Sequence, residues 1–170
     1  MFDKQQYLQE MTALIDDAIR LMTLGNPGFK IYTISIWTDP NAAASSINFD
    51  SKDNSLKNVE ESNEWSKKCY AKYLVENNFE QTELFKPNIG TRVCNPADFA
   101  LRDFCVTTHK SFPQNWETGT DGKCWMELEP ALIEVGNYAF SKINSLNMEV
   151  GFELSINSQI DWYAKTWPMK

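Results

Sequence analysis

The sequence predicts an α+β fold: one globular domain over residues 1–170, with a mostly antiparallel or mixed central sheet of about four to five strands and three main helices packed on it. Helical periodicity marks three long segments, at residues 3–24, 58–77 and 124–146. Strand patterns precede or follow them, at residues 29–39, 45–50, 96–106 and 150–157. A chain of this length buries roughly 70% of its unfolded surface, so the core needs no disulfide or metal to hold it.

The most strand-like stretch is residues 29–39. Large or β-branched side chains occupy both its odd positions, such as Ile31 and Trp37, and its even positions, such as Ile34 and Ile36. A strand covered on both faces lies in the middle of a sheet. We therefore expect this strand at the centre, with helices or loops on each side.

The first helix is predicted over residues 3–24. Asp3 is placed to cap its N-terminus, Gly25 to end it, and Pro27 to prevent its continuation. Its apolar residues recur at helical spacing and should face the sheet: Tyr7, Met11, Leu14, Ile15, Ala18, Ile19 and Met22.

A hairpin is predicted next, because turn residues at 39–41 separate the central strand from a second one at residues 45–50. Ile47 and Phe49 share one face of that second strand. The polar residues 50–57 are predicted to form a loop.

The second helix is predicted over residues 58–77, with Asn58 and Glu61 at the spacing of a capping box. Glu60, Glu61 and Glu64 then lie near the helix N-terminus, where the helix dipole favours acids. Its predicted buried stripe is Val59, Ser62, Ser66, Tyr70, Tyr73 and Leu74.

Residues 79–95 are predicted to form a long exposed loop, and such loops are often functional. Two interpretations compete for residues 95–106. Asn95 followed by Pro96 resembles a helix start, whereas Phe99, Leu101 and Val106 suit a strand, which we favour. Residues 110–122 are rich in turn formers.

The third helix is predicted over residues 124–146, with Pro130 either in its first turn or causing a kink. The last strand covers residues 150–157, where apolar side chains alternate. The aromatic tail, residues 161–167, is expected to pack on the domain or to meet a partner.

The net charge of the chain limits the kinds of partner that we expect. Lys and Arg number 16 against 23 Asp and Glu, for a net charge of −7. A negative field repels phosphate, so we expect no nucleic-acid partner. It attracts a basic protein, which complementary charge would steer into contact.

The location is predicted to be cytoplasmic. The apolar runs are shorter than the ~20 residues that a membrane span needs, and the first residues lack the pattern of an export signal. The four cysteines are irregularly spaced, so we expect reduced thiols: Cys69, Cys94, Cys105 and Cys124.

Catalytic motifs are sparse. His109 is the one histidine, and zinc motifs, phosphate-binding glycine loops and the nucleophile motif Gly-x-Ser-x-Gly do not occur. We therefore expect no enzyme activity, no catalytic residue, no cofactor and no metal.

Two groups of residues keep an enzyme as the alternative, namely a small hydrolase or transferase. Cys105 and His109 could meet if their segment were helical. Asp39, Asp50 and Asp53 could gather near the hairpin and bind a divalent cation. For both groups, structural roles are the favoured explanation.

The order of the elements resembles a family. A capped helix leads into a strand ending Ile34-Ser35-Ile36-Trp37-Thr38-Asp39; a short strand, an acidic helix, an isolated Trp116 after Phe112-Pro113, a long helix and a last strand follow. This layout resembles the small, acidic, cytosolic immunity proteins of bacterial toxin systems, including contact-dependent growth inhibition. The resemblance implies a standalone domain, monomeric or homodimeric, that binds and blocks a cognate toxin domain, often a basic nuclease. It assigns no individual residue a role.

The acidic residues of the second helix and of the following loop are the predicted contact surface for such a toxin: Glu60, Glu61, Glu64, Glu80 and Glu83. A further alternative is a structural subunit of a larger assembly.

Overall fold

A computed structural model describes residues 1–87, 90, 92–119 and 122–169, and it confirms the α+β class. In chain order the elements are α1 (Lys4–Gly25), β1 (Ile31–Asp39), β2 (Ala44–Asp50), α2 (Lys52–Val75), α3 (Phe79–Leu84), β3 (Leu101–Thr108), α4 (Trp116–Gly119), α5 (Lys123–Lys142), β4 (Met148–Ile156) and β5 (Lys165–Pro168). Short 3₁₀ turns precede β3, at Pro96–Asp98, and follow α5, at Ile143–Ser145.

The strands form one mixed sheet in the order β3-β2-β1-β4-β5. β1 is its central strand, as predicted, and pairs antiparallel with β2 and parallel with β4. β3 and β5 each add antiparallel at an edge. Because β1 and β4 are parallel, their carboxyl ends meet at the same end of the sheet.

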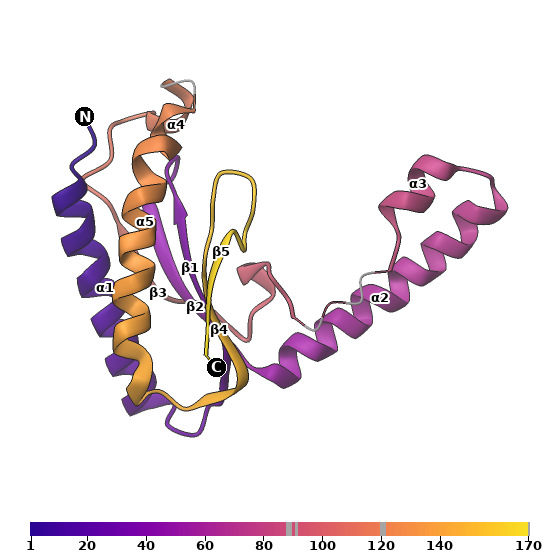
Figure 1. Ribbon diagram of the computed structural model, residues 1–170, viewed down its shortest axis with the longest axis horizontal. Coiled ribbons are helices and arrows are strands. Elements are labelled where there is room, and N and C mark those ends of the chain that lie inside the picture. Colours follow the sequence, from indigo (N-terminus) through magenta and orange to yellow (C-terminus); the bar gives the residue numbers. More distant parts are fainter. Residues whose placement is uncertain (88–89, 91, 120–121, 170) are drawn as a thin grey trace.

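One face of the sheet carries the apolar core. α1 and α5 lie side by side on this face (Figure 1). Ile34 and Ile36 of β1 pack there with Ile47, Phe49 and Leu154 of the neighbouring strands. Their alternation in sequence is what places them on one face.

The opposite face is polar, and loops cover it. Thr33 and Ser35 of β1 and Ser155 of β4 are fully buried there. Asn48 of β2 accepts a hydrogen bond from the backbone of Asp103 at 2.7 Å, and Pro96 of the segment before β3 is also buried. β1 is thus covered by helices on one side and by loops on the other.

α2 differs from its prediction at its start and in its packing. Ser51, not Asn58, caps it by accepting a hydrogen bond from the backbone of Asn54, so the predicted loop at residues 50–57 is mostly helix. α2 projects away from the sheet, and α3 folds back on its far end (Figure 1).

The predicted buried stripe of this helix is wrong, since Ser55 is the one residue of α2 classed as buried. The periodicity is present, but the helix leaves the sheet beyond Asn58, whose side chain still donates to Asp98 O. The stripe is therefore only partly covered: Tyr73 stacks on Phe85, whereas Ser62 and Leu74 are exposed. We call α2 and α3 together, residues 52–84, the arm.

The two segments between α2 and β3 differ in part from their predictions. Residues 79–95 include the helix α3, with Asn78 as its cap, and are not loop throughout; residues 88, 89 and 91 lie outside the described ones. In residues 95–106, Asn95 caps the 3₁₀ turn and the strand begins at Leu101, so each interpretation holds for one part.

Pro130 lies in the interior of α5 and not in its first turn. Pro130 and Met126, one turn earlier, are both exposed, so the missing backbone hydrogen bond lies on the water-facing side, where its loss costs least. The aromatic tail ends in β5, whose Trp167 ring lies against Gly136 of α5 so closely that a Cβ there would clash. Among the described residues, no helix combines the length and the apolarity that crossing a bilayer requires.

Candidate functional site

The single histidine lies in a chain of hydrogen bonds that sequence reasoning missed. Its Nδ1 is 2.8 Å from Glu10 Oε2, and its Nε2 is 2.7 Å from Ser45 Oγ. Ser45 Oγ also forms a hydrogen bond of 2.6 Å with Thr38 Oγ1, and Thr38 Oγ1 forms one of 3.1 Å with Tyr7 OH. Glu10, Ser45 and His109 come from α1, β2 and the end of β3, so no local sequence motif could have predicted that they meet.

The order serine, histidine, carboxylate is that of a hydrolase triad, but here the serine and the histidine are buried and no substrate can reach them. Ser45 is 1% exposed and His109 5% exposed. Burial lowers the pKa of His109, against the opposing effect of the Glu10 carboxylate. A nucleophile must reach a substrate, and this hydroxyl faces a second buried hydroxyl instead. The network therefore ties α1 to the hairpin and to the end of β3.

The structure does not assemble the two groups that the alternative enzyme function would need. Cys105 lies in a strand, so four extended residues separate it from His109 by roughly 13 Å. Asp39 and Asp50 sit at opposite ends of the β1–β2 hairpin, since Asp39 pairs with Ala44 and Asp50 with Thr33. The described residues contain no cluster of three or more acidic, cysteine or histidine side chains arranged for a metal ion.

Asp50 has a structural task. It is fully buried, and its Oδ1 accepts hydrogen bonds from Asn54 Nδ2 of α2 and from the backbone of Ala100. Burial raises the pKa of this carboxyl, against those hydrogen bonds. Asp50 thus joins the base of the arm to the segment before β3.

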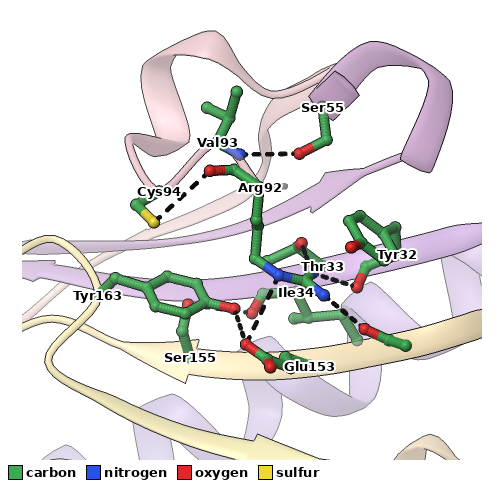
Figure 2. A network of polar contacts seen from close by, with 11 residues as sticks. Tyr32, Thr33, Ile34, Ser55, Arg92, Val93, Cys94, Glu153, Ser155 and Tyr163 are labelled. Atoms are coloured by element: carbon green, nitrogen blue, oxygen red, sulfur yellow. Dashed lines mark hydrogen bonds and ion pairs between the residues drawn. The ribbon is translucent and has the colours of Figure 1, made fainter. Parts of the chain in front are cut away.

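Arg92 anchors the same segment to the polar face of the sheet. Figure 2 shows its guanidinium inserted between β1 and β4, where it donates to Tyr32 O, Thr33 Oγ1 and Gly151 O. The Nε atom lies 3.5 Å from Glu153 Oε2, which also accepts from Tyr163 OH at 2.6 Å. The guanidinium carbon lies 3.7 Å from the centre of the Tyr32 ring.

These contacts occupy Arg92 within the fold. Beside it, the backbone of Val93 donates to Ser55 Oγ at 2.8 Å, so the segment also holds the first turns of α2. Cys94 is exposed nearby, and partial burial raises the pKa of its thiol, which disfavours the reactive thiolate. We interpret this network as the attachment of the arm, not as a reactive site.

An open pocket lies at the other end of the sheet, where the parallel strands β1 and β4 finish. Its volume is about 250 Å³. Three indoles line it, from Trp37, Trp125 and Trp162, and so do three carboxylates, from Asp39, Glu117 and Asp161. None of the described residues that line it is basic. We call it the tryptophan pocket.

The walls of the tryptophan pocket are held in place by hydrogen bonds and stacking. Glu117 accepts from Trp125 Nε1 at 2.7 Å and from Asn41 Nδ2. The rings of Trp37 and Trp162 are inclined by 20°, with 6.4 Å between centroids. Trp162 is nevertheless 50% exposed, so its ring is open to a ligand.

The five glutamates predicted as the contact surface, Glu60, Glu61, Glu64, Glu80 and Glu83, are all exposed on the arm. Because α2 begins at Lys52, the first three lie in the middle of the helix and are too far from its N-terminus to serve the dipole. Glu61 and Glu83 have lysine partners, Lys57 and Lys86, at 3.8 and 3.9 Å.

The arm also exposes apolar side chains. α3 packs on α2 through the ring of Phe85, 5.0 Å from Trp65 and 5.4 Å from Tyr73 between centroids. Trp65 keeps more than half of its surface exposed, and other apolar residues of the arm also face solvent. Their exposed fractions lie between 41% and 83%: Leu56, Trp65, Leu74, Val75, Phe79 and Leu84.

Charge is distributed unevenly between arm and body. The arm carries five lysines against seven acids, a net charge of −2, so the body, which is the rest of the chain, carries −5 of the total −7. The tryptophan pocket lies on the acidic body, at the end of the hairpin opposite to the arm.

Comparison with known proteins adds no relative. No protein-family model matches the chain, and no curated protein or solved structure gives a significant match.

Proposed function

We propose that this protein is an immunity protein, which binds a cognate, basic bacterial toxin domain in the cytoplasm and neutralises it by covering its surface. The observation that carries the proposal is the arm: a long amphipathic helix and its companion that leave their apolar side chains exposed. Exposed aromatic and aliphatic groups beside charged ones are typical of protein-binding surfaces.

The occupant of this surface is a basic partner because the arm carries more acids than lysines and two of its glutamates are unpaired. Glu60 and Glu64 precede the exposed Trp65 on α2, and the described residues give neither glutamate an ion-pair partner. The acidic body adds a long-range field that steers a basic protein towards the complex. Because Glu60, Glu61 and Glu64 lie in the middle of α2 and not at its N-terminus, the helix dipole does not explain their presence.

The location of the polar groups also favours binding over catalysis. The histidine and its serine are buried, the glutamate is half-buried, and the arginine is bound by the sheet. The arm and the tryptophan pocket present aromatic, aliphatic and acidic side chains to solvent, and the arm adds lysines, a composition suited to recognition.

The first test uses the product of the neighbouring reading frame as the partner. Purified together, the two proteins should form a stable complex, and addition of this chain should abolish the toxic activity of the partner at equimolar amounts. A complex without neutralisation, or neutralisation without a complex, would contradict inhibition by covering.

The second test locates the surface by charge. Glu60→Lys with Glu64→Lys should lower the association rate and flatten its dependence on salt, because steering depends on the charges near the contact. Stopped-flow mixing at several salt concentrations measures both. Glu127→Lys with Glu129→Lys is the matched control, since these residues are exposed on α5 and change the net charge equally.

If both pairs change the rate equally, the arm is not the contact surface and only the overall charge matters. If neither pair changes it, the electrostatic part of the proposal is wrong.

A further inference from the structure

We propose that the tryptophan pocket binds the guanidinium group of an arginine side chain presented by the protein partner. This inference rests on the proposed function for the source of the arginine. The chemistry of the site stands on the pocket itself and can be tested without the partner.

The pocket offers the two things that a guanidinium requires. Aromatic faces attract a cation through the quadrupole of the ring, and tryptophan does so most strongly. Carboxylates provide charge-assisted hydrogen bonds to its N–H groups. Here both kinds line one cavity, without a described basic residue to compete.

Two carboxylate oxygens are available for this purpose. Asp39 uses Oδ1 for the backbone N–H groups of Asn41 and Ala42, and Asp161 uses Oδ1 for the backbone of Tyr163. Within the described part of the chain, the Oδ2 atom of each accepts no hydrogen bond. Both carboxylates are therefore fixed in orientation by one oxygen and left open at the other.

The flat ring arrangement favours arginine over lysine. Trp37 and Trp162 lie nearly parallel, and half of the Trp162 surface faces solvent. A planar guanidinium stacks on such a ring and keeps its N–H groups in its own plane, free to donate to the carboxylates, whereas a tetrahedral ammonium cannot do both. The volume of about 250 Å³ suits one side chain and not a large ligand.

The pocket and the arm lie at opposite ends of the β1–β2 hairpin, so one partner that reaches both spans the loop-covered face of the sheet. The arm supplies apolar contact, and the pocket accepts a single charged anchor. Binding at two separated points raises specificity, because a competitor must satisfy both.

The test titrates the protein with N-acetyl-arginine methylamide and follows the six tryptophan indole N–H signals by NMR. Small ligands of this size bind weakly, so saturation is expected in the millimolar range. The signals of Trp37, Trp125 and Trp162 should shift. Those of Trp65 on the arm and Trp116 in the core should stay unchanged.

Two further ligands and two variants decide the chemistry. The citrulline analogue, which has the same shape without the charge, should cause no saturable shift, and the lysine analogue should bind more weakly. Asp161→Asn keeps an oxygen for the Tyr163 N–H but removes the charge, and should weaken arginine binding by about tenfold. Glu129→Gln, on an exposed position of α5, should leave it unchanged.

Absence of a saturable shift, or equal binding of citrulline, overturns the site. Equal or tighter binding of lysine overturns the assignment to arginine. Asp161→Asn should speed dissociation of the complex with the toxin partner. If the complex is tight and its dissociation rate is unchanged by this variant, the pocket is not an anchor, while the proposed function stays intact. Arginine binding in a protein that neutralises no toxin refutes the proposed function instead.

Discussion

His109 illustrates how a residue that looks catalytic becomes structural through burial. Its two nitrogens are satisfied by Glu10 and Ser45, and its ring stacks on Phe112 and meets Tyr7 edge-on. Burial also raises the pKa of Tyr7 at the far end of the same chain of hydroxyls. Neutral hydrogen-bonding groups in such a network cost less to bury than charged ones.

The stability of the protein should therefore depend on pH through His109. Its pKa is lower in the folded state than its usual value of about 6.5. Above pH 6.5 the imidazole is neutral in both states, and its contribution is fully present. As the pH falls from 6.5 through the folded-state pKa, the unfolded state binds the proton first, so the free energy of unfolding should decrease.

Urea unfolding between pH 5 and 8 measures this decrease, and the NMR signal of the single imidazole reports the folded-state pKa directly. A midpoint at or above 6.5 in the folded protein would mean that the Glu10 carboxylate outweighs burial, and it would reverse the predicted slope.

At the scale of elements, the segment between α3 and β3 shows how a loop is held without secondary structure of its own. Arg92 enters the sheet, Val93 holds Ser55, and Asp50 accepts from the backbone of Ala100. These contacts satisfy the buried polar groups of the loop-covered face, where β1 and β4 bring hydroxyls instead of apolar side chains.

Arg92→Met should lower the free energy of unfolding by about 2–4 kcal/mol, because it leaves carbonyls of Tyr32 and Gly151 and the Glu153 carboxylate without their cation. Urea unfolding measures the loss. Arg102→Met is the matched control, since Arg102 is exposed on β3, and it should change stability by less than about 0.5 kcal/mol. Equal effects of the two substitutions would show that the Arg92 contacts contribute nothing specific.

At the scale of the whole molecule, the protein combines a packed body with an arm that has little burial of its own. The helices α1 and α5 bury a continuous stripe against the sheet, whereas α2 buries Ser55 alone. Local stability follows buried apolar contact, so the two parts should differ in how readily they open.

Hydrogen exchange should reveal this difference. Amides of α2 beyond residue 60 and of α3 should exchange by local opening, faster than those of α1, β1 and α5, which require global unfolding. Addition of the toxin partner should slow exchange in the arm more than in the α1–α5 layer. Uniform protection of arm and body in the free protein would contradict the division, and unchanged exchange in the bound arm would contradict its role as the contact surface.

Much of the fold could be predicted because its signals are local. The stripe from Tyr7 to Met22, the alternation around Ile34 and the turn at Asp39 each identify an element without knowledge of the rest. The prediction was wrong where a local pattern was assumed to be buried by the rest of the chain: the stripe of α2 is periodic, yet it is only partly covered, with Tyr73 under Phe85 and Leu74 exposed. The start of α2 was also misplaced, because Ser51 and Asn58 are both acceptable caps.

The sites were less predictable. Glu10, Ser45 and His109 meet only through the packing of three elements, and the two groups weighed for the alternative enzyme function do not assemble. Trp37, Trp125 and Trp162 stood in three separate predicted segments, so nothing in their spacing indicated a shared pocket. The aromatic tail was the nearest signal, since it contains too many aromatic residues for a free end.

The amino-acid sequence by itself determined the class of the fold, its central strand and the two helices that cover the apolar face, because hydrophobic periodicity is set by neighbours a few residues apart. The tertiary structure alone decided that the histidine is buried, that α2 leaves the body, and that three tryptophans and three carboxylates share one pocket. Those features depend on contacts between residues distant in the chain, which strand order and register establish.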